Sequence, residues 1–238
     1  TKPFEIRDYL DKVILQEQQL SLASQTIGDK AWMKRVIHNS GGIGGETGVI
    51  RNYTTSMANV LSNNRFGADV HTFYKTSNDP VQISAYEQIL DLLNNGVSIW
   101  SIFGHSSAFT VDFDIGQPGA YSNYGRYPLM LIMGCFSGQC SLNQPSIGER
   151  FVNAADRGAI AYIASVNYSF TDALHSYGRQ YYERLGGQDY GKSVGLTLVH
   201  TVSDLKDTQY EGLIAVLHQN LLQGDPAVRI YAHDGPDY

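Results

Sequence analysis

The sequence has 238 residues, of which 42 % are hydrophobic and 17 % are charged, and its net charge is −6. This length accommodates one α/β domain with a sizeable core, and an acidic chain argues against a nucleic-acid-binding protein, whose surface is normally basic. The sequence has no apolar run near the ~20 residues of a membrane span and no signal peptide. Because it starts within a helical pattern, we expect a mature fragment of a larger protein.

The first part of the chain alternates between helical and extended patterns. Residues 3–20 predict an amphipathic helix, because apolar side chains recur on one face at Ile6, Leu10, Val13, Ile14 and Leu20. The elements expected next are a strand at 32–38, a glycine-rich loop at 40–48, a helix to about residue 64, a strand at 69–74 and a helix at 80–94 that starts with proline and stops near glycine.

Three continuous apolar runs follow, at residues 97–103, 129–133 and 159–164. Unbroken runs of this kind indicate strands that are buried on both faces, as in a parallel sheet covered by helices. The first run ends just before His105 and the second just before Cys135. Between them, residues 106–127 predict a long irregular loop, and loops of that length are usually functional.

The last third of the chain is mainly helical. Helices are expected over residues 145–155, 171–185, 190–205 and 210–222, and a final strand over residues 227–231, after the turn at 224–226. The second of these helices carries an apolar stripe at Leu174, Tyr177, Tyr181 and Leu185. Because strands alternate with helices along the chain, the pattern predicts an α/β domain of three layers.

His105 and Cys135 directly follow two successive predicted strands. Ligands bind beyond the carboxyl ends of the strands in an open parallel sheet, so neighbouring strands would bring these side chains together. A Cys–His peptidase needs this arrangement, because an imidazolium favours the nucleophilic thiolate and later protonates the leaving amine. The alternatives are a cysteine that acts as a small buried hydrophobe and a histidine that is an ordinary loop residue.

The residues beside the two candidates indicate how an oxyanion would be held. We expect the N–H groups of Ser106 and Cys135 to form an oxyanion hole, with Gly134 leaving room for a substrate backbone. A zinc site made of His105, Cys135 and Cys140 would lack a fourth ligand, so no metal is expected there. Cys140 is expected to pack in the loop after the nucleophile.

Five stretches of the sequence follow a known pattern in the same order. They are residues 101–107 (SIFGHSS), residues 131–138 (LIMGCFSG), the strand at 158–165, the turn at 224–226 and the lead-in helix at 8–17. Together they resemble the gingipain-type cysteine peptidases, family C25 of the caspase-like clan CD. The first two resemble the histidine and nucleophile motifs of that family, and the resemblance covers nearly the whole chain.

The resemblance implies a caspase-like three-layer α/β/α sandwich with a mainly parallel sheet. It implies that residues 1–238 form a single catalytic subdomain of a larger secreted bacterial protein, with His105 as the catalytic histidine and Cys135 as the nucleophile. It also implies a polypeptide substrate, a secreted or cell-surface location, and other domains of the same precursor as partners.

The sequence departs from the family pattern at three places. Ser106 replaces the second glycine of a Gly-His-Gly motif, which is compatible with a hole that uses only the N–H group. Ser40 stands where some members have an acid that orients the histidine, so Glu46 in the same loop is the candidate for that role; its alternative role is to favour the helix dipole. Ile50 and Arg51 stand where the best-known members need an acidic pocket residue, so we expect no preference for Arg or Lys.

Further loop residues are candidates for the site. Asn167 and Tyr168, with Phe170, are expected to wall the substrate pocket, and ordinary loop packing is the alternative. Asp112 and Asp114 are expected to be solvated loop acids, and a structural calcium ion is the alternative, because carboxylates suit hard cations. The glycine-rich loop has neither of the common phosphate-binding motifs, so a nucleotide site is not expected.

We therefore predict a cysteine endopeptidase that needs no cofactor, in which Cys135 attacks the scissile carbonyl and His105 transfers protons through an acyl-enzyme. One alternative is a sortase-like transpeptidase that uses the same dyad with an amine acceptor. Another is a non-catalytic binding module that keeps the fold. An unrelated α/β hydrolase is disfavoured, because the GxSxG motif is absent.

Overall fold

The computed structural model describes residues 2–21, 26–140 and 142–230. Six strands form one sheet in the order β2-β1-β3-β4-β5-β6. The strands are β1 (Arg35–Ser40), β2 (Asp69–Tyr74), β3 (Ile99–Phe103), β4 (Leu129–Met133), β5 (Ala161–Ser165) and β6 (Asn220–Gly224). Strands β1 to β5 are parallel to one another and β6 is antiparallel to β5, so the predicted mainly parallel sheet is confirmed.

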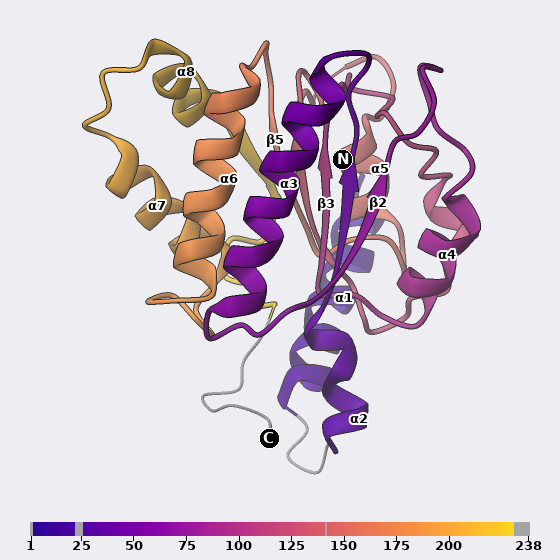
Figure 1. Ribbon diagram of the computed structural model, residues 1–238. Coiled ribbons are helices and arrows are strands. Elements are labelled where there is room, and N and C mark those ends of the chain that lie inside the picture. Colours follow the sequence, from indigo (N-terminus) through magenta and orange to yellow (C-terminus); the bar gives the residue numbers. More distant parts are fainter. Residues whose placement is uncertain (1, 22–25, 141, 231–238) are drawn as a thin grey trace.

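Helices cover both faces of the sheet (Figure 1). On one side lie α3 (Glu46–Asn63), α6 (Thr171–Leu185), α7 (Val194–Leu205) and α8 (Glu211–Gln219), and on the other lie α4 (Tyr86–Asn94) and α5 (Ile147–Asn153). Two further helices, α1 (Pro3–Ser21) and α2 (Ile27–Lys30), precede the sheet in the chain. This arrangement confirms the predicted three-layer α/β/α sandwich.

The central strands divide their side chains between two cores. In β3, Ile99 and Phe103 belong to the core under α3 and α6, whereas Trp100 and Ile102 belong to the core under α4 and α5. Successive side chains of a strand point to opposite faces, so a strand covered on both faces is apolar at most positions; in β3 the exception is Ser101, which is buried. Burial on both faces is the physical reason for the apolar runs of the sequence.

The strand expected at residues 227–231 is wrong. The sixth strand is β6, and the described residues 227–230 are not in a strand; Tyr231 lies outside the described residues. The apolar pair Leu221 and Leu222 continues the pattern of α8, so the sequence alone extended that helix to residue 222. The chain instead leaves the helix at Asn220 and pairs with β5, and the turn at 224–226 follows the strand.

The predicted apolar face of α1 is also wrong in part. Ile6, Leu10 and Ile14 are exposed, whereas Lys12 and Gln16 are buried. The Lys12 ammonium donates hydrogen bonds to backbone carbonyls of residues 151, 152 and 159, and the Gln16 amide bonds with the backbone N–H and C=O of residue 127. The need to satisfy backbone groups in the last turn of α5 and just before β4 and β5 therefore decides which side of α1 is buried.

Several predicted elements begin later than the sequence indicated. α4 starts at Tyr86 rather than near Pro80, because Gln82 is held in an extended bridge with Phe113. α5 and α7 start after Ser146 and Ser193, whose side chains cap the helices by accepting the N–H group three residues on. β1 starts at Arg35, because residues 31–33 form a 3-10 turn.

No helix within residues 2–21, 26–140 and 142–230 is long and apolar enough to cross a membrane.

Candidate active site

His105 and Cys135 lie at equivalent positions beyond two paired strands. β3 and β4 are parallel neighbours, and their register places Phe103 opposite Met133. Each candidate lies two residues beyond its member of that pair, and neighbouring strands lie about 5 Å apart. The two strands are therefore neighbours, which is the condition for bringing the two side chains together, and both residues lie at the carboxyl end of the sheet.

The imidazole of His105 is paired with Glu46. The His105 Nε2 atom lies 2.9 Å from the Glu46 Oε2 atom, and both side chains are about half exposed, at 54 % and 57 %. Glu46 is the first residue of α3, which follows the glycine-rich loop after β1. Because β1 is the other neighbour of β3, this loop reaches the imidazole, and it brings the predicted acid into contact with His105.

Cys135 is half-buried and has a free thiol. Its Sγ atom lies 3.7 Å from the Ser169 carbonyl oxygen, in the loop that follows β5. Among the described residues, no hydrogen bond joins the thiol to His105. The thiol thus contacts the loop after β5, and Cys135 is partly exposed to solvent.

The two predicted oxyanion donors are next to each other. Within the described segments, neither the N–H of Ser106 nor that of Cys135 donates a backbone hydrogen bond, so both remain able to receive an oxygen atom. The Ser106 hydroxyl donates to the Cys135 carbonyl oxygen at 2.8 Å. This bond requires glycine at position 134, because a Cβ atom there would lie 2.2 Å from the Ser106 Oγ atom.

The loop after β5 forms a wall beside Cys135. The Phe136 N–H donates to the Asn167 carbonyl at 3.2 Å, and the Phe136 and Tyr168 rings meet edge to face with their centroids 4.5 Å apart. Phe136 has a φ of 59°, a left-handed conformation that is uncommon for a bulky residue and is found at functional sites. Tyr168 is 74 % exposed, so its ring is available to a substrate.

The expectation that Asp112 is a solvated loop acid is wrong. Its side chain is buried and forms an ion pair with the equally buried Lys75, with 2.8 Å between the Oδ1 and Nζ atoms. Its Oδ2 atom accepts the N–H of His105 at 2.8 Å and that of Gly42 at 2.7 Å. Asp112 is therefore not available as a ligand of a calcium ion, because Lys75 already supplies the positive charge beside its carboxylate.

Two glycines make room for the Asp112 carboxylate. A Cβ atom at Gly41 would lie 2.2 Å from the Asp112 Oδ2 atom, and one at Gly104 would lie 2.3 Å from it. The glycines after β1 and β3 therefore let the carboxylate approach both loops. The sequence assigned neither glycine this role and did not single out Lys75, although Lys75 directly follows a predicted strand at the same end of the sheet.

The remaining candidates lie outside this cluster. Asp114 accepts the N–H of Gly116 at 2.8 Å and stabilises a turn of the long loop. Cys140 is exposed, so the expectation that it packs in its loop is wrong. Burial lowers the pKa of His38 to about 4, and its Nε2 atom is bonded to the Tyr182 hydroxyl, as expected of a structural histidine. Within the described residues, no three His, Cys, Asp or Glu side chains converge on a metal position.

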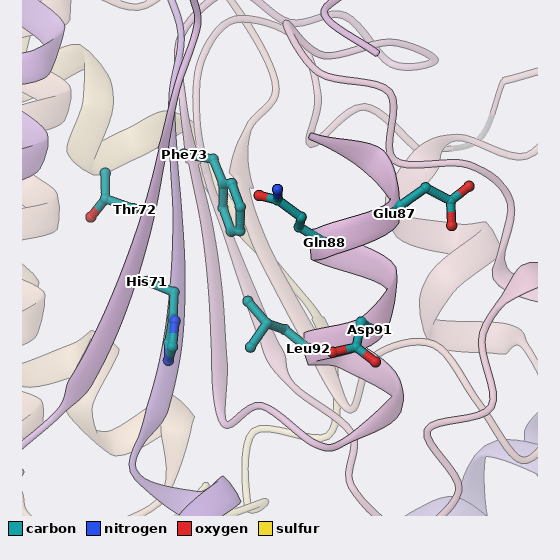
Figure 2. A pocket seen from close by; sticks show the side chains of 7 residues that line it. All are labelled: His71, Thr72, Phe73, Glu87, Gln88, Asp91 and Leu92. Carbon is teal, nitrogen blue, oxygen red and sulfur yellow. The ribbon is translucent and has the colours of Figure 1, made fainter. Parts of the chain in front are cut away.

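A cavity of about 500 Å³ lies elsewhere, between β2 and α4. Figure 2 shows Phe73, Gln88 and Leu92 turned toward one another between the strand and the helix, whereas Thr72 and Glu87 point away. The cavity contains no nucleophile and none of the predicted site residues. The chemistry that the sequence indicates is therefore at the carboxyl ends of β3 and β4 and not in this cavity.

Comparison with known proteins places the chain in a family. Residues 1–231 match the model of peptidase family C25, which confirms the resemblance found in the sequence. No curated protein is a significant match in sequence.

Solved structures of similar fold include gingipains. The crystal structure of the Arg-specific cysteine proteinase gingipain R (RgpB) is 17 % identical, with a TM-score of 0.72, and the match covers 93 % of this chain and 52 % of that one. A structure described as a protease is 17 % identical, with a TM-score of 0.74 and coverage of 96 % and 54 %. The complex of the Porphyromonas gingivalis RgpB pro- and mature domains is 18 % identical, with a TM-score of 0.69 and coverage of 90 % and 53 %. The chain thus spans about half the length of these structures and shares their fold.

Proposed function

Because the chain belongs to peptidase family C25, we propose that it carries the catalytic centre of a cysteine endopeptidase with a Cys135–His105 dyad. The observation that carries the proposal is the matched position of the two residues, each two residues beyond a directly paired strand. The contact between Glu46 and the His105 imidazole supports it, since a base that is held by a carboxylate has a fixed orientation.

In the proposed reaction, the Cys135 thiolate attacks the scissile carbonyl carbon, and the carbonyl oxygen takes up the negative charge. The N–H groups of Ser106 and Cys135 stabilise this oxyanion. The protonated His105 then gives its proton to the leaving nitrogen, the C–N bond breaks, and a thioester remains on Cys135. A water molecule gives a proton to His105 and attacks the thioester, the C–S bond breaks, and the acid leaves while the Cys135 thiolate and protonated His105 are regenerated.

We assign a polypeptide substrate, and Tyr168 and Asn167 line the side of the site that the substrate would contact. Two acids contact His105: Glu46 is engaged with its imidazole, and Asp112 is buried and paired with a lysine. We therefore assign no preference for basic residues. We propose a secreted or cell-surface location, with further domains of the same precursor as partners, since the chain covers about half of its structural neighbours.

The test needs no knowledge of the substrate. Alkylation of Cys135 by iodoacetamide is followed by peptide mass spectrometry between pH 4 and 9, with the exposed Cys140 as internal reference. We expect Cys135 to react at least about tenfold faster than Cys140 at pH 6, because a neighbouring imidazolium favours the thiolate. The variant His105→Ala should remove this advantage, and His71→Ala, on the edge strand β2, should retain it.

Equal rates for the two cysteines, or no effect of His105→Ala, would refute the dyad and leave a binding module. If the dyad is confirmed, digestion of an unfolded protein with and without an added amine separates hydrolysis from transpeptidation. Products capped by the amine would show that the protein is a transpeptidase and not a hydrolase. Products with free carboxyl termini would support the endopeptidase. The variant Cys135→Ala controls for contaminating peptidases.

A further inference from the structure

The structure places a buried ion pair directly beneath the proposed dyad. Asp112 and Lys75 are both buried, with 2 % of each residue exposed. Taking two charges out of water is costly, and such a pair is weak evidence for stability by itself. Its hydrogen bonds indicate what else it does.

The Asp112 carboxylate joins the two loops that carry the His105–Glu46 pair. One loop follows β3 and is held through the His105 N–H, and the other follows β1 and is held through the Gly42 N–H. Glu46 lies four residues beyond Gly42, at the start of α3. A single carboxylate oxygen therefore sets the position of the histidine backbone relative to the segment that supplies its acid partner.

Lys75 fixes the direction in which the carboxylate points. Its ammonium bonds the Oδ1 atom, so the Oδ2 atom remains free to accept the two N–H groups. Further bonds hold this arrangement, since the Asp112 carbonyl accepts the Gln82 N–H and Lys75 also donates to the Pro80 carbonyl. The orientation of Asp112 is thus determined from both sides.

We infer that Asp112, oriented by Lys75, is a positioning residue that sets the geometry of the His105–Glu46 pair. The inference rests on the proposed function, and it adds to the site a buried residue that touches neither the substrate nor the thiol. Misplacement of a catalytic group by 1 Å can cost about 10²-fold in rate, so a rigid support of this kind is of direct consequence for catalysis.

The main variant is Asp112→Asn, which keeps the shape and removes the charge. An amide has one acceptor and one donor end, so its NH₂ group would face either the Lys75 ammonium or the two N–H groups. We expect the rate of Cys135 alkylation at pH 6 to fall at least about tenfold, with native far-UV circular dichroism. The double variant Asp112→Asn/Lys75→Gln should recover most of the rate, because an amide at position 75 can accept from the new NH₂ group.

A second variant perturbs the carboxylate without changing any charge. In Gly41→Ala the added Cβ atom would lie 2.2 Å from the Asp112 Oδ2 atom, so the carboxylate or the loop must shift. We expect the same loss of Cys135 reactivity. Gly48→Ala is the matched control, because an added Cβ atom there meets no other atom within 4 Å, and it should react like the wild type.

A readout independent of thiol chemistry separates this inference from the proposed function. The ¹⁵N chemical shift of His105 Nε2 reports its bond with Glu46 whether or not the protein cleaves peptides. We expect Asp112→Asn to move this shift toward the value of Glu46→Gln. A folded Asp112→Asn variant with unchanged shift and unchanged Cys135 reactivity would overturn the inference while the dyad stands. If wild-type Cys135 reacts like Cys140, the proposed function fails, and the Nε2 shift alone decides the positioning role.

Discussion

The two ends of the sheet each bury a lysine, but they neutralise it in different ways. At the carboxyl end, Lys75 meets the carboxylate of Asp112. At the amino end, Lys12 meets three backbone carbonyls, at 2.8, 3.0 and 3.3 Å, and lies over the Tyr127 ring. Carbonyl dipoles offset less of the burial cost than a full negative charge does, and burial accordingly lowers the pKa of Lys12 to about 7.

This difference separates two uses of a buried charge. Lys12 attaches α1 to the last turn of α5 and to the residue two positions before β5, and none of these contacts involves the proposed site. Lys75 acts on a carboxylate whose other oxygen holds the backbone of His105. A buried lysine therefore anchors a helix at the amino end of the sheet, and at the carboxyl end it orients a carboxylate that contacts the proposed site.

The largest expected effect is on stability when one member of the charged pair is removed. Lys75→Met leaves the Asp112 carboxylate buried without its cation, which should cost about 3–5 kcal/mol. Lys12→Met removes a charge that was already poorly compensated, so we expect a change of no more than about 2 kcal/mol. Urea unfolding at pH 7 measures both, and equal losses would contradict the distinction.

The next largest effect is a pH dependence of the unfolding free energy, which comes from Lys12 at the amino end of the sheet. The pKa of Lys12 falls on folding from 10.5 to about 7, mainly by desolvation. Between these values the unfolded chain binds more protons, so the unfolding free energy should rise with pH, by about 2 kcal/mol from pH 7 to pH 9. Lys12→Met should remove this rise, and Lys206→Met, at an exposed position, should keep it. A variant Lys12→Met with the same pH slope as the wild type would show that Lys12 is not its source.

The smallest effect on stability is expected at the exposed pair. Glu46 and His105 are both about half in contact with solvent, and pairs of this kind contribute little to stability. Glu46→Gln should therefore change the unfolding free energy by less than about 0.5 kcal/mol. It should nevertheless lower the alkylation rate of Cys135 at pH 6, because the imidazole loses its charged partner. A large stability loss, or an unchanged alkylation rate, would place Glu46 in a different role.

The sequence predicted the structure correctly where a residue pattern had only one physical explanation. The apolar runs identified β3, β4 and β5, because strands covered on both faces are apolar at most positions. His105 and Cys135 could be placed for the same reason, since both directly follow such strands. The proximity of Glu46 was only one of two interpretations of an acid in the glycine-rich loop.

The sequence failed where a polar residue is buried for the sake of a distant partner. Asp112 lies in a long loop rich in polar residues, and its partner Lys75 is 37 positions away, so neither carries a local signal of burial. Lys12 and Gln16 were misassigned for the same reason, because backbone carbonyls are acceptors that no residue type reveals. The strand β6 was missed because two leucines fit a helix and an edge strand equally well.

The shared register of β3 and β4 has a consequence for engineering. Since the spacing of the two proposed catalytic residues is set by backbone pairing, exchanges of core side chains that conserve volume should leave that spacing intact. A single-residue deletion at either strand end would instead slide one partner along the sheet by about 3.3 Å. Variation among relatives should therefore be tolerated in the composition of these strands and rejected in the lengths of their carboxyl ends. The backbone pairing of β3 and β4 fixes the spacing of the two residues. Libraries designed on this fold can therefore randomise the interior residues of these strands, provided that the length of each strand is kept.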